Sequence, residues 1–534
     1  MNVPPRLVRA ADWILNHPKL SVTVAGAMAA YAMAPFYIWP LMMLALCVYV
    51  LAMARITSPW RGAWTTFFFG MGFFTFGLWW IVNALMMDIR QYWWALGFSI
   101  LGLPVLLSLL WFVAGWLAVR LTPPGGLARA VATLTLLMAA EYGRAFNLSG
   151  FPWNLFGYMW ADVPALMQSA AIGGAYYVTF MTSLWMALPA LLWLARPSRR
   201  RQVVIAVIGI GSFAASFAWG AWRLAEHPAT PREDTAVVIV QPNITPDEKW
   251  RPEDAVEHFK THIDLTRDGL SELDQHQPPF MDVAVVWPET ALDEQMVMGV
   301  PEVPKLLVET LRGHPYRAAM VTGLWREDGT DSLNQPNYYN SVGDISLVGG
   351  KLNLDDVYNK HHLVPFGEYI PLEQTLHMKP IVGFAGFKWG TGPKVLQSPV
   401  VPPVAPMICF EAIFPWYGKS EGAQWLVNTS NDGWYGDTAG PYQHLAMTRF
   451  RAVEQGKPVI RSATTGISAV IGPYGRVLRS VAFNHAGYIA LALPDYIKGG
   501  TLYTYWGETP FFALLAAGLI VAAFLRLRND STNS

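Results

Sequence analysis

The chain has 534 residues, of which 53 % are hydrophobic and only 14 % are charged. That much apolar surface exceeds what one soluble core can bury, so part of the chain is expected to lie in lipid. The formal net charge is zero, but Met1 to Ala225 carries 14 Lys and Arg against 4 Asp and Glu, while Glu226 to Thr509 carries 22 against 33. An acidic polar segment excludes a polybasic nucleic-acid-binding protein. With 24 Trp and 27 Phe, the chain is also unlike a disordered protein.

Apolar stretches that are long enough to cross a hydrocarbon core, with few or no charges, dominate the first half of the chain. There are eight: Leu20–Ala34, Phe36–Ala54, Ala63–Met87, Tyr92–Val119, Leu127–Ala145, Pro164–Ala195, Gln202–Leu224 and Pro510–Leu527. They predict a multi-pass α-helical membrane domain of eight spans, seven within residues 1–225 and the eighth within residues 506–534. A signal peptide is an alternative for the first stretch, because Arg6 and Arg9 precede it.

Basic residues gather in alternate loops between these stretches, which sets the expected orientation because Lys and Arg are retained on the cytoplasmic side. One set of loops and ends holds Arg6, Arg9, Lys19, Arg55, Arg61, Arg120, Arg129, Arg196, Arg199, Arg200, Arg201, Arg526 and Arg528. The other set offers little beyond Arg90 and Arg144. We therefore predict that both termini are cytoplasmic and that the polar segment is exported. In a bacterium this is an inner-membrane protein with a periplasmic domain.

The polar segment, residues 226–505, has the size of a single globular domain. Its pattern is mixed α/β, with helical stretches at Pro252–Leu273 and Pro301–Arg312. Short β-rich runs recur at Ala236–Gln241, Val283–Trp287, Ala318–Leu324, Val404–Phe410, Trp425–Asn428, Pro458–Ala463 and Ser468–Ile471. The segment is therefore expected to fold as an α/β domain.

Cys409 is the only cysteine in the expected exported domain, so it has no disulfide partner there. It follows the apolar run Val404 to Ile408, which places it where a strand ends and a loop or helix begins. A nucleophile at such a position has backbone N–H groups nearby to act as oxyanion donors. On residue type alone, the alternative is a small buried hydrophobic side chain.

Glu289 and Lys360 are the other two candidates for chemistry. Glu289 follows the run Val283–Trp287 and Pro288, so that its carboxylate emerges at a strand end, where burial would raise its pKa toward that of a general base. Lys360 precedes the unusually apolar loop Leu363–Gly367. The plainer interpretations are an acid at a helix N-terminus for Glu289 and a solvated side chain for Lys360.

In this order and context the three residues resemble the Glu-Lys-Cys triad of the nitrilase, or carbon–nitrogen hydrolase, superfamily. A domain of this kind that follows seven spans and precedes an eighth resembles, in particular, the arrangement of the apolipoprotein N-acyltransferase family. Supporting stretches are Ser149–Asn154, Gln241–Ile244, Lys360–Glu368 and Asn428–Gly436. The resemblance implies an α-β-β-α sandwich for the exported domain. Phe410 departs from the pattern, in which Tyr is expected directly after the nucleophile.

The chemistry of the triad follows from its residue types. Glu289 takes the proton of the Cys409 thiol as the sulfur attacks an ester carbonyl, and it later protonates the departing alcohol. Lys360 and the backbone N–H of Phe410 stabilise the oxyanion. The resemblance implies that a phospholipid donates an acyl chain to Cys409 as a thioester. It also implies that the N-terminal amine of diacylglyceryl-cysteine on an apolipoprotein accepts this chain.

Further residues have supporting roles in this scheme. The resemblance implies that Glu368 helps to place Lys360, and Glu411 is a second supporting candidate. Trp250 and Trp434 lie in polar, turn-rich stretches and are predicted to contact acyl chains or headgroups, with ordinary core packing as the alternative for Trp434. No cofactor, metal ion or nucleic acid is expected, and we expect a monomer in the bilayer.

Other interpretations remain open at this point. A membrane-tethered amidase would share the triad, and a transporter with a regulatory domain is disfavoured by the few charges in the spans. A papain-like site would pair Cys409 with a histidine such as His444 but would leave Glu289 and Lys360 unused. His258 and His262 have a zinc-like spacing but lack the metalloprotease glutamate, so we interpret them as a solvated helix face.

Overall fold

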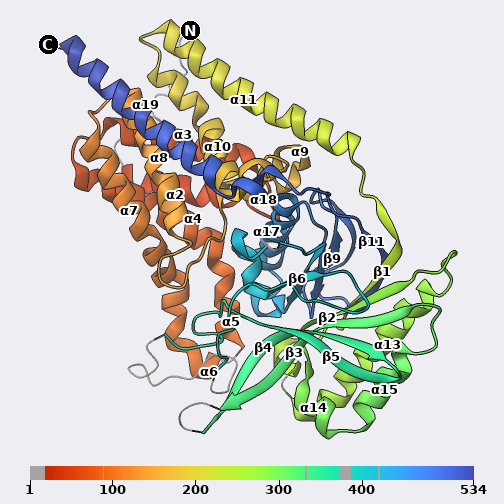
Figure 1. The fold of residues 1–534 in the computed structure, drawn as a ribbon. Helices are drawn as coiled ribbons and strands as arrows, with labels where there is room; N and C mark the ends of the chain where they lie inside the picture. The colour runs from red at the N-terminus through yellow and green to blue at the C-terminus, as the bar shows by residue number, and fades with distance from the viewer. Residues whose placement is uncertain are drawn as a thin grey trace. The chain divides into compact units, whose positions relative to one another are not determined.

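The computed structural model describes residues 18–87, 89–249, 251–330, 334–371, 386–418 and 421–533 (Figure 1). The chain forms two compact units. The first comprises Met1–Val82, Asp88–Glu226 and Tyr505–Ser534, and the second comprises Asn83–Met87 and His227–Thr504. The short segment Asn83–Met87 therefore groups with the second unit, although it lies between two apolar helices in the sequence.

The first unit is helical. Its longer helices are α2 (Pro18–Ala30), α3 (Trp39–Arg55), α4 (Pro59–Leu78), α7 (Leu103–Leu121), α8 (Leu127–Gly143), α10 (Ala170–Leu194), α11 (Arg199–Glu226) and α19 (Thr509–Asn533). Shorter pieces join them: η1 (Trp79–Ile81), α6 (Ile89–Tyr92), η2 (Trp93–Ala95), η3 (Phe98–Gly102), η4 (Phe156–Asp162) and α9 (Pro164–Met167). Helix α5 (Val82–Met86) follows η1 in the sequence, but all of it except Val82 belongs to the second unit. Proline opens α3, α4 and α7 within the first two residues, where its missing N–H costs no hydrogen bond.

Within the described residues, five helical segments are long and apolar enough to cross a membrane. They are Pro59–Met86, Trp93–Leu121, Ala170–Leu194, Arg199–Glu226 and Thr509–Arg528. Three of the eight expected spans correspond to shorter helices: α2 is described over 13 residues, and α3 and α8 have 17 each. The membrane character of the unit is clear, whereas the number of eight spans is not confirmed. Arg6 and Arg9, on which the signal-peptide alternative depends, lie outside the described residues.

The second unit contains two β-sheets. One has six strands in the order β11-β1-β2-β3-β4-β5, and the other has five in the order β10-β9-β8-β7-β6. The strands are β1 (Pro231–Gln241), β2 (Asp282–Asp293), β3 (Arg317–Thr330), β4 (Pro336–Val348), β5 (Lys351–Asn359), β6 (Val404–Ile408), β7 (Trp425–Ser430), β8 (Val459–Ala463), β9 (Ser468–Ile471), β10 (Val477–Val481) and β11 (Gly487–Pro494). Strands β1, β2 and β3 run parallel, as do β6, β7 and β8. All seven expected runs are strands, but β4, β5, β10 and β11 were not expected.

The sheets pack face to face, with helices on their outer faces. Side chains from both sheets, such as Val286 of β2 and Val427 of β7, share one buried cluster. The other face of the six-stranded sheet packs against α13 (Ala255–Leu273) and α15 (Glu302–Leu311). Helix α17 (Ala439–Gln455) contacts β8 of the second sheet. The helical remainder consists of α12 (Pro246–Lys249), η5 (Pro252–Asp254), α14 (Glu294–Gly299), η6 (Cys409–Ile413), η7 (Pro415–Gly418), η8 (Asp432–Tyr435) and α18 (Leu502–Trp506).

Strand β2 differs from the expectation that Pro288 would end it. The strand continues to Asp293, but its pairing with β3 shifts between Trp287 and Leu292. In this irregular stretch Thr290 has a φ of 46°. Gly323 of β3 lies directly beneath, where a Cβ atom would come within 2.2 Å of the Pro288 carbonyl oxygen. Because Gly323 has no side chain, the bulge of β2 that carries Glu289 can pack directly against the backbone of β3.

Candidate active site

Cys409 is the first residue after β6, as its sequence context predicts, and it opens the short helix η6. Its side chain is buried, with an exposed fraction of 6 %. Its φ is 47°, a left-handed conformation that residues with a side chain rarely adopt. Backbone strain of this kind gathers at functional sites, where the surrounding structure has to hold it in place.

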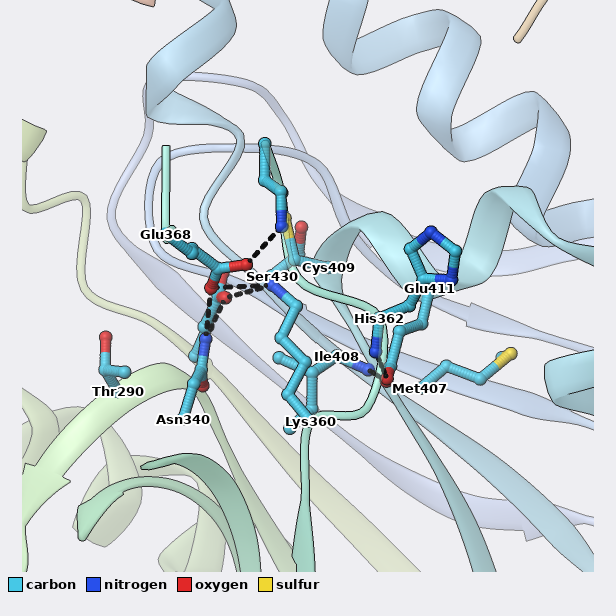
Figure 2. A network of polar contacts seen from close by, with 12 residues as sticks. Thr290, Asn340, Lys360, His362, Glu368, Met407, Ile408, Cys409, Glu411 and Ser430 are labelled. Carbon is cyan, nitrogen blue, oxygen red and sulfur yellow. Dashed lines mark hydrogen bonds and ion pairs between the residues drawn. The ribbon is translucent and has the colours of Figure 1, made fainter. Parts of the chain in front are cut away.

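Lys360 follows the last residue of β5 and is almost fully buried, with an exposed fraction of 1 %. Its backbone is fixed on both sides: its N–H donates to the Asn340 carbonyl at 2.8 Å, and its carbonyl accepts from the Gly390 N–H at 2.8 Å. Its ammonium group donates to Oε1 of Glu368 at 2.9 Å (Figure 2). It also donates to Oε1 of Glu289 at 3.3 Å. Lys360 is therefore not the solvated lysine of the plainer interpretation.

Asn340, on β4, completes this cluster. Its Nδ2 donates to Oε1 of Glu368 at 3.0 Å (Figure 2). It also donates to Oε1 of Glu289 at 2.7 Å. Each of these carboxylate oxygens thus accepts from both an amide and an ammonium group. Both donors contact Oε1 of Glu289, so its second oxygen, Oε2, is the one that can take a proton.

The electrostatics of the cluster favour a charged ammonium group at Lys360 and a neutral thiol at Cys409. Burial on its own lowers the pKa of Lys360, but the carboxylates of Glu368 and Glu289 outweigh it and hold the pKa above its ordinary value. Burial and the nearby Glu289 carboxylate raise the pKa of Cys409 to about 12, against a lowering effect of Lys360. Cys409 is therefore a thiol at neutral pH, and an attack by it on a carbonyl would need a base.

Two hydroxyl groups contact the thiol. The Ser430 hydroxyl, at the end of β7, lies beside the Cys409 side chain but donates its hydrogen to Oδ1 of Asp432 at 2.7 Å. Tyr435, in η8, is also hydrogen-bonded to Cys409. A thiolate formed at Cys409 would therefore be stabilised by the neutral Tyr435 hydroxyl as well as by the Lys360 ammonium group.

Glu411 joins the two segments that carry Lys360 and Cys409. Its Oε1 accepts from the Tyr358 hydroxyl at 2.7 Å and from the N–H groups of His361 at 2.9 Å and His362 at 3.1 Å. Its Oε2 accepts from the N–H of Ile408 at 2.8 Å. This fully buried carboxylate thus holds the loop after β5 against the end of β6.

Glu368 also combines a contact to the cluster with a contact to its own loop. Its Oε1 accepts from Lys360, and its Oε2 accepts from the backbone N–H of Val364 at 2.8 Å. The loop turns back at this point, and the Glu368 N–H donates to the Val364 carbonyl at 2.9 Å. Glu368 is thereby fixed in the position from which it holds the Lys360 side chain.

The aromatic candidates lie in different surroundings. Phe410 is buried, and its ring packs against those of His362 and Phe414. Trp434 is half-buried in η8, two residues after the buried Asp432. Trp250 lies outside the described residues. The chain therefore brings Phe410 to the site, while the lipid-contact roles of the two tryptophans stay predictions.

The positions of His444 and His262 differ from two interpretations made from the sequence. A papain-like pair would require a bond from His444 to the Cys409 thiol. Nε2 of His444 instead lies 3.0 Å from the backbone carbonyl oxygen of Cys409 and bonds the main chain. His262 is buried and packs on the ring of Trp287 at 4.8 Å between centroids, so it is not part of a solvated face. Its neighbour His258 supplies a backbone carbonyl to His262 Nδ1 at 2.7 Å.

Sequence reasoning missed Asn340 and Lys249. Lys249 Nζ donates to the Glu289 carbonyl and to the Thr290 hydroxyl, both at 2.6 Å, and burial lowers its pKa to about 8 despite the Glu289 carboxylate. Lys249 lies in the same stretch as Trp250, and that stretch was noticed only for its tryptophan. Asn340 has no local signal, because its role depends on the pairing of β4 with its neighbours.

The fold and the site together define a membrane protein that carries a carbon–nitrogen hydrolase domain. The family model described as carbon-nitrogen hydrolase matches residues 285–497. The model described as apolipoprotein N-acyltransferase N-terminal domain matches residues 25–185. An amidase from Nesterenkonia sp. of known structure is similar to 51 % of this chain and 94 % of its own, with a TM-score of 0.34 and 19 % identity.

Relatives match over nearly the whole length. The apolipoprotein N-acyltransferase of Brucella suis is 34 % identical, covering 98 % of this chain and 98 % of its own. That of Agrobacterium fabrum is also 34 % identical, covering 93 % of this chain and 94 % of its own. The chain belongs to the apolipoprotein N-acyltransferase family. The resemblance stated from the sequence is thereby confirmed.

Proposed function

We propose that this chain is an acyltransferase that moves an acyl chain from a phospholipid, through a thioester on Cys409, to the N-terminal amine of diacylglyceryl-cysteine on apolipoproteins. The observation that carries the proposal is the buried cluster at the strand ends, in which Lys360 bonds both Glu289 and Glu368 beside the Cys409 thiol. The membership of the chain in the apolipoprotein N-acyltransferase family supports this choice of substrates over the small carbon–nitrogen compounds of a tethered amidase.

In the first half-reaction, Glu289 removes the thiol proton while the Cys409 sulfur attacks the ester carbonyl of the phospholipid. The carbonyl oxygen becomes an oxyanion, stabilised by the Lys360 ammonium group and the N–H of Phe410. When the tetrahedral intermediate collapses, the C–O bond breaks and Glu289 gives its proton to the leaving alcohol. A lyso-phospholipid leaves, and a thioester remains on Cys409.

In the second half-reaction, the amine of the apolipoprotein attacks the thioester carbonyl. Glu289 takes a proton from the attacking nitrogen, and the same donors stabilise the second oxyanion. The C–S bond then breaks, Glu289 returns the proton to the sulfur, and an amide is released. The same cluster thus performs both half-reactions in turn, as a ping-pong scheme requires. Neither half-reaction uses a cofactor.

A two-substrate assay tests this function. We expect phospholipid vesicles alone to load Cys409 and release about one equivalent of lyso-phospholipid in a burst, because the buried thioester waits for its amine. A diacylated lipopeptide with a free α-amine then discharges the enzyme to an amide, detected by mass spectrometry. An N-acetylated lipopeptide is the control and should leave the thioester intact. Continuous fatty-acid release that the lipopeptide does not change would instead identify a hydrolase.

We further propose that the chain has eight membrane spans, seven within residues 1–225 and one within residues 506–534. Residues 226–505 then form the catalytic domain on the periplasmic side of a bacterial inner membrane, with both termini cytoplasmic. The alternation of basic loops supports this orientation, and it places Cys409 where exported lipoproteins are found. The cluster of triad residues comes from one chain, so the enzyme is proposed to act as a monomer.

Reporter fusions test the orientation. A reporter that is active only outside the cytoplasm should be active when it is inserted near Gly329 and silent when it is fused after Arg528. A cytoplasm-specific reporter at the same two sites is the control and should give the opposite pattern. If both reporters reversed this result, the domain would face the cytoplasm and the proposed apolipoprotein acceptor would be out of reach.

A further inference from the structure

His444, on α17, holds the main chain at the nucleophile. A carbonyl oxygen only accepts hydrogen bonds, so the 3.0 Å contact to the Cys409 carbonyl means that Nε2 of His444 carries the hydrogen. The His444 side chain is completely buried. The bond therefore joins a rigid helix to a residue whose φ of 47° needs support from its surroundings.

A fully buried polar network fixes the ring from the other side. Nδ1 of His444 lies 2.9 Å from Oδ1 of Asp432 and 3.2 Å from Nη2 of Arg461. Nη2 of Arg461 also donates to Oδ2 of Asp432 at 2.5 Å, and the Ser430 hydroxyl donates to Oδ1 at 2.7 Å. A Cβ atom at Gly466 would lie 2.6 Å from Oδ2 of Asp432, so the carboxylate has no room to move on that side.

The protonation of this network is consistent with a neutral ring. Burial and the neighbouring Arg461 guanidinium lower the pKa of His444, against the effect of Asp432. Burial opposes ionisation of Asp432, yet Arg461 and His444 hold its pKa below the ordinary value. In the neutral Nε2–H form, Nδ1 accepts from Arg461 and Oδ1 of Asp432 takes the hydrogen of Ser430, whereas in the charged form Nδ1–H donates to Oδ1 of Asp432. Nε2 keeps its hydrogen for the Cys409 carbonyl in both forms.

The Cys409 carbonyl and the Phe410 N–H belong to one peptide plane and point in opposite directions. A bond that fixes the carbonyl therefore also fixes the direction of the N–H. We propose that His444 is a positioning residue that holds this peptide so that the Phe410 N–H faces the oxyanion. The role rests on the proposed function only in assuming acyl transfer through Cys409, since any ester or amide substrate would use the same oxyanion donor.

Two substitutions of His444 distinguish its bond to the Cys409 carbonyl from its contacts with Asp432 and Arg461. His444→Gln places an amide N–H where Nε2 lies, whereas His444→Asn reaches only the place of Nδ1. Both are made in a Cys47→Ser background, so that Cys409 is the only thiol. Acylation is read from the nitrophenol burst with p-nitrophenyl butyrate, which forms an oxyanion. Thiol reactivity is read from alkylation by iodoacetamide, which forms none.

We expect His444→Asn to slow the burst roughly 10- to 100-fold, somewhat less than the complete loss of an oxyanion donor, and to change alkylation by less than about threefold. His444→Gln should recover most of the burst rate. Asp432→Asn, a second variant, should slow the burst several-fold without slowing alkylation. Thr448→Val is the matched control, because the Thr448 hydroxyl bonds the backbone carbonyl of His444 at 2.9 Å and Nη1 of Arg461 at 3.4 Å, but not the ring of His444. It should lower the melting temperature and leave the ratio of the two rates unchanged.

Equal slowing of both reactions by His444→Asn would overturn the inference, because a merely structural role disturbs the whole site. A His444→Gln variant as slow as His444→Asn would overturn it as well. The butyrate ester needs neither a phospholipid nor a lipopeptide, so this result is independent of the two-substrate assay. An enzyme that fails with phospholipid but shows the split between burst and alkylation would refute the proposed substrates and retain the role of His444.

Discussion

Cys409→Ala is expected to reduce acyl transfer to background, a loss of about 10⁴- to 10⁶-fold, because no other group in the cluster can form the covalent intermediate. Cys409→Ser should be nearly as inactive. The site already raises the pKa of the thiol to about 12, and a hydroxyl is a weaker acid still, so Glu289 would have to deprotonate a much poorer nucleophile. Intact-mass analysis after incubation with phospholipid measures the effect, since only wild type should gain an acyl chain.

Cys47→Ser is the matched control for this loss. Cys47 is half-buried on α3 in the first unit, and its thiol faces the backbone carbonyl of Met186 at 3.6 Å. A serine there keeps a donor for that carbonyl, so adduct formation and transfer should both match wild type. Full turnover by Cys409→Ala, or an acyl adduct that moves to Cys47, would contradict the assignment of the nucleophile.

Most strands with continuous apolar runs were predictable, although the apolar strand β11 was missed, whereas β4 and β5, which carry several polar residues, were not predictable. The runs at β2 and β6 are buried on both faces, and each leads directly into a residue of the triad. Strand β4 was missed because its sequence contains Asn340, Ser341 and Asp344, all of which are buried. Asn340 belongs to the site, so one of the polar residues that hide the strand from a hydrophobicity pattern also contacts the cluster.

The partners of the triad depend on strand register, which a single sequence does not reveal. Asn340 meets Lys360 because β4 pairs with β5 antiparallel, with Ser341 opposite Asn359. No spacing rule links an asparagine to a lysine 20 positions later. His444 was visible as a possible partner of Cys409, but whether its ring faces the thiol or the carbonyl depends on how α17 packs against η6.

Helix α8, an expected span that is not among the five long apolar helices of the described residues, differs from them for a physical reason. Helix α8 carries Arg129 and Glu141, and both side chains are buried within the first unit. Arg129 donates to the carbonyls of Ile56 and Val119 at 2.6 Å and 3.3 Å, groups left unpaired near the ends of α3 and α7. A buried charge such as that of Arg129 interrupts the apolar run in the sequence. In the fold, the same side chain donates hydrogen bonds to carbonyl groups at the ends of neighbouring helices.

Lys360→Met is the second change for which we expect a large effect. It removes an oxyanion donor, a loss of about 10²- to 10³-fold in acylation rate. It also leaves two buried carboxylates, Glu289 and Glu368, without their cation, which is expected to cost about 3–5 kcal/mol of folding stability. A simple loss of activity would therefore not distinguish a role in the oxyanion from a role in charge balance.

The double variant Lys360→Met with Glu368→Gln separates these roles. It removes one positive and one negative charge, so the cluster keeps the net charge of wild type, and we expect its melting temperature to recover. The nitrophenyl ester burst should nevertheless stay about 10²-fold or more below wild type, because the donor to the oxyanion is still missing. Glu368→Gln alone is the control and should lose less, since Lys360 remains tethered by Glu289 at 3.3 Å. If the double variant regained the burst together with its stability, Lys360 would serve only to neutralise the carboxylates.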